Sequence, residues 1–169
     1  MSDTDTTVSY DPPLPEVGEC IVLITRDFAA PRAVVWKFFS EPEYLAQWFG
    51  PVGVHVDPAS VVVELRPGGR WDLDMVDDAT GEHYPVRSTL RVVTPPAYLE
   101  GEMSSRPPGD DPEVVAEKIV LRIWLHDQGD STRLTIHQGP FGQEFREMTS
   151  TGWELSFTKI DAILEGISA

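Results

Sequence analysis

The sequence contains little cysteine and no long apolar run. Its single cysteine, Cys20, excludes an intrachain disulfide and a cysteine-based zinc cluster. No apolar run approaches the roughly 20 residues that span a bilayer, and the acidic start of the chain lacks the basic and apolar regions of a signal peptide. These absences predict a soluble cytoplasmic protein with no segment inserted in a membrane.

Positive charge is also scarce. Lys and Arg together number 13 against 28 Asp and Glu, which gives a formal net charge of −15 at pH 7. Nucleic acids and anionic membranes are polyanions, so electrostatics would repel them from this protein. The composition therefore argues against both as partners and favours an uncharged small molecule, or a neutral or basic protein.

Length and composition fit one domain with a tail, because 169 residues of which 41% are hydrophobic can build one substantial core. Residues 1–19 contain no Lys or Arg and include the run Pro12-Pro13-Leu14-Pro15, which is typical of a solvated segment. We therefore expect a disordered acidic tail over 1–19 and a folded domain over 20–166.

Apolar spacing predicts the elements of that domain. A strand over 21–28 precedes a helix that begins after Ala30-Pro31 and a short helix over 42–47. Six strands are then expected at 54–65, 70–76, 84–93, 98–104, 115–126 and 132–138, and a helical period begins near Gln143. The order β-α-α-β6-α predicts an α+β fold in which a curved antiparallel sheet wraps around a long C-terminal helix.

A cavity is expected between this sheet and this helix, because one helix does not fill a strongly curved sheet. Along 70–76, the apolar residues Trp71, Leu73 and Met75 alternate with charged ones, so one face of the strand points inward. Ile119 and Leu121 likewise share one strand face. The inward surface of the sheet is therefore predicted to be apolar.

Tryptophan occurs in three signatures, at 42–51, at 67–71 and at 152–153. Large aromatic side chains at such places cover a core or line a pocket, and both interpretations stay open for each of them. Met148, Gly152 and Ser156 share one face of the predicted last helix. Gly152 would admit either a ligand or close helix packing, and the thioether of Met103 would adapt to varied ligands. The candidate ligand-binding residues are Trp48, Phe49, Trp71, Leu73, Met75, Met103, Ile119, Leu121, Met148, Gly152, Trp153 and Ser156.

Catalytic and metal-binding patterns are weak. The serines lack a nucleophile-elbow pattern, and the four histidines fall on separate predicted strands without zinc-site spacing. We therefore predict no catalytic residue, no metal and no cofactor. Acid–base chemistry would require an ionisable side chain that faces the cavity, and Arg87, Glu117 and His137 are the candidates.

Several short motifs occur in a fixed order along residues 20–166. They are Arg26-x-Phe28-x-Ala30-Pro31, Gln47-Trp48-Phe49-Gly50-Pro51, Gly68-Gly69-Arg70-Trp71, Val93-x-Pro95-Pro96, Thr132-Arg133-Leu134-Thr135 and Gly152-Trp153. This ordered set resembles the START-like (SRPBCC, Bet v 1-type) helix-grip superfamily, and within it the single-domain proteins similar to the activator of Hsp90 ATPase. Ser88 departs from the glycine that such proteins often carry in the fourth strand.

The resemblance implies a hydrophobic ligand cavity. It favours binding of a small hydrophobic or amphipathic molecule in a carrier, sensor or stress-related role, and it is compatible with a homodimer. Two alternatives remain open, a polyketide cyclase or aromatase-like enzyme and a co-chaperone or regulatory module, because a fold alone does not choose among functions. Residues 1–19 are too short for the module with which the two-domain co-chaperone contacts Hsp90, so Hsp90 activation is not expected.

Overall fold

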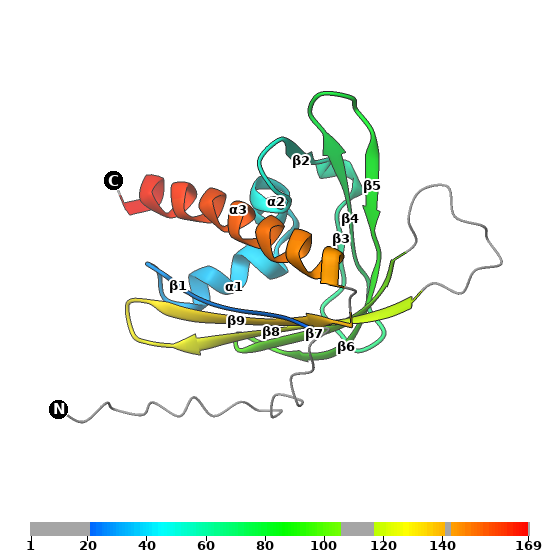
Figure 1. Cartoon of the computed structure of the whole chain (residues 1–169). Coiled ribbons are helices and arrows are strands. Elements are labelled where there is room, and N and C mark those ends of the chain that lie inside the picture. Colours follow the sequence, from blue (N-terminus) through cyan, green and yellow to red (C-terminus); the bar gives the residue numbers. More distant parts are fainter. Residues whose placement is uncertain (1–20, 106–116, 141–142, 169) are drawn as a thin grey trace.

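The fold joins a large and a small antiparallel sheet to three helices (Figure 1). The computed structural model describes residues 21–105, 117–140 and 143–168, so the predicted tail and Cys20 lie outside it. The elements are β1 (Val22–Phe28), α1 (Arg32–Ser40), α2 (Pro42–Trp48), β2 (Val54–Val56), the 3-10 turn η1 (Pro58–Ser60), β3 (Val62–Val63), β4 (Trp71–Asp77), β5 (His83–Val86), β6 (Ser88–Thr94), β7 (Tyr98–Ser105), β8 (Glu117–Asp127), β9 (Thr132–Gly139) and α3 (Gln143–Ser168).

The large sheet has the strand order β1-β9-β8-β7-β6, and the small sheet has the order β2-β4-β3 with β5 paired to β4. Helix α3 lies across one face of the large sheet, and β4 and β5 rise beside it (Figure 1). An isolated bridge between Arg70 and Thr89 and a hydrogen bond of 2.8 Å from the Leu90 amide to the Gly69 carbonyl link the two sheets. The predicted helix-grip architecture is confirmed.

Two of the predicted strands are each divided in the structure. The strand expected over 54–65 is interrupted by η1, because the Asp57 side chain accepts a hydrogen bond from the Ala59 amide and Pro58 begins the turn. The strand expected over 84–93 is divided at Arg87, where the chain leaves β4 and joins β7 in the other sheet. An alternating pattern alone does not show that a strand changes partner.

Two indole groups fix the end of α1, one from α2 and one from β4. The Trp48 Nε1 donates a hydrogen bond of 2.7 Å to the Phe38 carbonyl, and the Trp71 Nε1 donates one of 2.9 Å to the Phe39 carbonyl. Both carbonyls belong to the last turn of α1, where carbonyls lack intrahelical partners. These bonds explain why two fully buried tryptophans carry no unsatisfied donor.

Aromatic rings fill much of the space between α3 and the sheets. Trp48 contacts Phe49, Trp153 and Phe157 with ring centroids 5.4 to 6.3 Å apart, and Phe49 contacts Trp71 at 5.5 Å. Such contacts add roughly 0.5–1.5 kcal/mol per pair beyond the burial of area. The aromatic side chains of the core therefore gather around the turn that follows α2.

Candidate functional site

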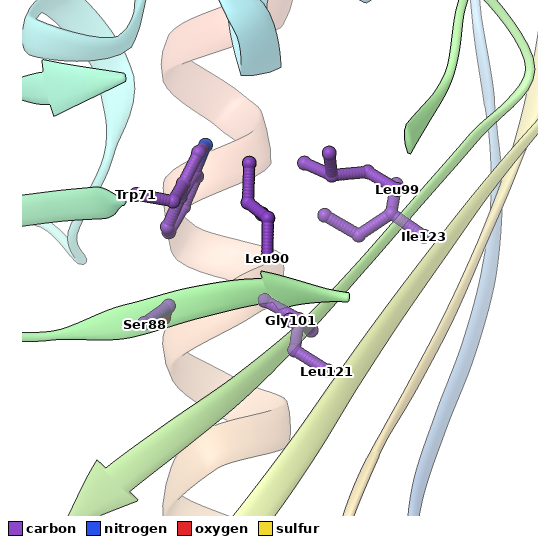
Figure 2. A pocket seen from close by; sticks show the side chains of 7 residues that line it. All are labelled: Trp71, Ser88, Leu90, Leu99, Gly101, Leu121 and Ile123. Carbon is purple, nitrogen blue, oxygen red and sulfur yellow. The ribbon is translucent and has the colours of Figure 1, made fainter. Parts of the chain in front are cut away.

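A small cavity lies beside this aromatic core. Its volume is about 10 Å³, close to the smallest space that holds one water molecule. Figure 2 shows the side chains of Trp71, Leu90, Leu99 and Ile123 converging on one side of the strands. The lining residues are Trp71, Ser88, Leu90, Leu99, Gly101, Leu121 and Ile123.

Strand register brings these residues together. Leu90 on β6 lies opposite Gly101 on β7, and Gly101 lies opposite Leu121 on β8. Alternate residues of a strand share a face, so Ser88 and Leu90 point to the same side, as do Leu121 and Ile123. Trp71 at the start of β4 closes the cavity from the small sheet.

The space exists partly because residue 101 is glycine. A Cβ atom at Gly101 would lie 3.6 Å from the Cδ2 of Leu90 and 3.6 Å from the Cβ of Ser88, which are ordinary contact distances. A methyl group would therefore fit there and would occupy room that is now empty.

The Ser88 hydroxyl introduces a polar atom into this apolar site. Ser88 is 5% exposed, and its Oγ is buried with no hydrogen-bond partner. Its amide is satisfied, because it donates a hydrogen bond of 3.2 Å to Oδ1 of the buried Asp72. The hydroxyl is thus the unsatisfied group of this residue.

Trp71 and Leu121 are the candidates predicted from sequence that line the cavity. Leu73 and Ile119 are buried, and Met75 is half-buried against the core. Trp48, Phe49 and Trp153 form the aromatic contacts next to Trp71.

Met103 takes part in a chain of contacts between β7 and α3. It is half-buried, and its sulfur accepts a hydrogen bond of 3.4 Å from Nε2 of Gln138 on β9. The Oε1 of Gln138 in turn accepts one of 2.8 Å from the Trp153 indole. Met103 is also the cross-strand neighbour of Ser88. This series of contacts therefore borders the cavity beside Ser88.

None of the candidates on α3 lines the cavity. Met148 is 63% exposed, and a Cβ at Gly152 would meet nothing within 4 Å, so close helix packing does not explain this glycine. Ser156 is buried, and its hydroxyl donates a hydrogen bond of 2.7 Å to the Gly152 carbonyl. A common helix face therefore did not predict a common environment.

Five lining residues were absent from the sequence prediction: Ser88, Leu90, Leu99, Gly101 and Ile123. Alternation with Leu121 would have identified Ile123, and the glycine within a predicted strand pointed to position 101. Ser88 and Leu90 required the register of β6 against β7, which the sequence does not contain.

Two of the candidate acid–base residues face away from the cavity. Arg87 forms an ion pair of 2.8 Å with Asp74 and donates a hydrogen bond to the Leu73 carbonyl. His137 lies on the sheet face opposite α3, where Nη1 of Arg122 is 3.4 Å from its Nδ1. Burial, and secondarily the charge of Arg122, lowers the pKa of His137. The side chain of Glu117 lies outside the described part of the structure.

Within the described ranges, no ionisable side chain lines the cavity, and no group of three His, Cys, Asp or Glu residues is placed to hold a metal ion. The described helices also include none that is both long and apolar enough to cross a membrane.

Comparison with known proteins assigns the family. The model for "Activator of Hsp90 ATPase homolog 1-like protein" matches residues 29–165. Because this match covers most of the chain, the protein belongs to that family, and the resemblance seen in its motifs is confirmed. No curated protein matches the chain.

Solved structures show the same fold. A Chromobacterium violaceum protein is 20% identical with a TM-score of 0.75, over 86% of this chain and 97% of its own. A Nitrosomonas europaea protein is 24% identical with a TM-score of 0.73, over 90% and 98%. An AHSA1 protein from Silicibacter pomeroyi is 24% identical with a TM-score of 0.73, over 86% and 97%. At these identities the likeness supports the fold alone.

Proposed function

We propose that this protein binds a small hydrophobic or amphipathic molecule, as a carrier or a sensor, in a cavity between the large sheet and β4 rather than directly against α3. The observation that carries the proposal is the cavity whose walls come from β4, β6, β7 and β8 and are almost wholly apolar. Burial of apolar ligand surface would supply the affinity, at roughly 25 cal/mol per Å² removed from water, less the cost of immobilisation.

A ligand of several atoms requires side chains to move, because the cavity of the free protein is only about 10 Å³. Met103 is suited to this movement, since it is half-buried beside Ser88 and has a flexible thioether side chain. Met75, half-buried on β4, has the same property on the side of the small sheet. Binding would thus enlarge an existing space rather than fill an open pocket.

The enzyme alternative has less support. A cyclase or aromatase-like reaction needs a group that moves a proton inside the cavity. Arg87 and His137 point elsewhere, and the described lining offers one hydroxyl and no ionisable side chain. Binding without acid–base chemistry fits these residues better.

Native mass spectrometry of the full chain, compared with the same sample denatured, tests the proposal. We expect a small apolar molecule to leave on unfolding, or, in an empty preparation, a rise in Tm with at least one of toluene, naphthalene and 1-octanol. A protein that carries no molecule and whose Tm is unchanged by all three compounds would contradict the proposal.

A further inference from the structure

The Ser88 hydroxyl is a buried polar group without a partner at the wall of an apolar cavity. Buried polar atoms are nearly always hydrogen-bonded, so an exception needs a physical reason. The lining residues Leu90, Gly101 and Trp71 offer the hydroxyl no free hydrogen-bond donor or acceptor. The indole nitrogen of Trp71 is already bonded to the Phe39 carbonyl.

A bound water does not supply that reason. Buried waters typically make about three hydrogen bonds to the protein. In this cavity the Ser88 hydroxyl is the one unsatisfied side-chain group among the described lining residues. The main chain of β6, β7 and β8 is paired within the sheet. A water at this place would leave most of its hydrogen-bonding capacity unused.

We infer that Ser88 is the polar contact for the ligand, and that the site takes an uncharged molecule with one hydrogen-bonding oxygen on an otherwise apolar body. This inference rests on the proposed function. The oxygen, of a hydroxyl or a carbonyl group, satisfies Ser88, and the apolar body packs against Leu90, Leu99 and Ile123. A charged group is disfavoured, because the described lining would leave it buried without a counter-charge.

The surroundings of Ser88 favour this orientation. Met103, its cross-strand neighbour, has a movable side chain and can give room at the end of the cavity where the oxygen binds. The aromatic contacts of Trp71 lie on the other side, where Phe49 fixes the indole edge-to-face at 5.5 Å. The ligand oxygen therefore lies at Ser88, and the apolar body of the ligand packs beside β7.

Calorimetric titration with phenol and toluene tests the inference, because the two compounds have equal numbers of heavy atoms and phenol is uncharged at pH 7. We expect Ser88→Ala to weaken phenol binding about three- to tenfold, which is the range of one net hydrogen bond. The same substitution should leave toluene binding unchanged, because toluene makes no hydrogen bond to the hydroxyl. Ser40→Ala is the matched control, because Ser40 is a buried serine whose hydroxyl is bonded to the Trp36 carbonyl.

The same titrations in Leu121→Ala test the role of Ser88 separately from the proposed function. This substitution enlarges the cavity, so both compounds can bind without movement of the strands. A fall in phenol affinity from Leu121→Ala to Leu121→Ala/Ser88→Ala, with toluene affinity unchanged, supports the role of Ser88. Phenol affinity that Ser88→Ala leaves unchanged in both backgrounds would overturn that role and leave the proposed function standing. Binding by Leu121→Ala alone would instead overturn the proposed function.

Discussion

The indole nitrogen of Trp153 donates a hydrogen bond of 2.8 Å to the side-chain oxygen of Gln138, and this bond joins α3 to the large sheet. Both residues are buried, at 7% and 6% exposure. Gln138→Met keeps the size of the side chain but leaves the indole N–H unsatisfied. We expect it to lower the free energy of unfolding by about 1–3 kcal/mol, as measured by denaturant titration.

A double-mutant cycle is the control for this bond. Trp153→Phe removes the donor, so Gln138→Met should cost distinctly less in that background than in the natural chain. Equal costs in the two backgrounds would show that the contact between α3 and β9 does not depend on this hydrogen bond.

Replacement of Ser88 by alanine should not destabilise the protein. The Ser88 hydroxyl is buried without a partner, so its removal relieves a desolvation penalty, and we expect a change between zero and a gain of about 1 kcal/mol. Ser40→Ala loses a hydrogen bond of 2.8 Å to the Trp36 carbonyl and should cost about 0.5–1.5 kcal/mol. If thermal unfolding showed the two variants equally destabilised, Ser88 would have a partner in solution.

Two glycines provide a matched test of the cavity. In Gly101→Ala the new methyl group occupies cavity space at ordinary contact distances, so we expect unchanged or slightly higher stability but weaker binding of toluene. Gly152→Ala adds a methyl group in open space on α3, so it should raise the free energy of unfolding by about 0.5–1 kcal/mol and leave binding unchanged. Unchanged toluene affinity in Gly101→Ala would exclude this cavity as the site.

Stability should decrease on acidification below about pH 6.5 because of His137. Burial, and secondarily the charge of Arg122, lowers its folded-state pKa from the usual 6.5, so the unfolded chain binds the proton first. The free energy of unfolding therefore falls with pH from 6.5 down to the folded-state pKa. His137→Gln should show a shallower fall, with a remainder from His126, whose pKa is lowered by burial.

Denaturant titrations between pH 7.5 and 5 measure how the histidines change the free energy of unfolding, without a contribution from carboxylates such as Asp27. The hydrogen bond from Arg133 lowers the pKa of Asp27 below 3.8, so that group titrates outside the range. Identical slopes for the natural chain and His137→Gln would contradict the assignment to His137.

The sequence predicted the order of elements because apolar periodicity reports which residues face a core. Two of its candidates, Trp71 and Leu121, line the cavity, since alternation along a strand fixes the face of each residue. It could not show that β5 and β6 belong to different sheets, because that change depends on which strand each one pairs with.

The α3 candidates show the limit of a helical pattern. Met148 and Ser156 were expected on one face, yet Met148 is exposed while Ser156 is buried. A helix 26 residues long that crosses a curved sheet meets different neighbours at its two ends. Ser88 escaped prediction for a related reason, since its place at the cavity depends on the register of β6 against β7.

The most direct test of ligand binding at this cavity is a methyl NMR titration of the full chain with toluene, with labelled isoleucine and leucine. We predict concentration-dependent shifts confined mainly to Leu90, Leu99, Leu121 and Ile123, with Leu45 and Leu164 as reporters elsewhere in the core. No shifts, or shifts centred on Leu45 or Leu164, would contradict the account.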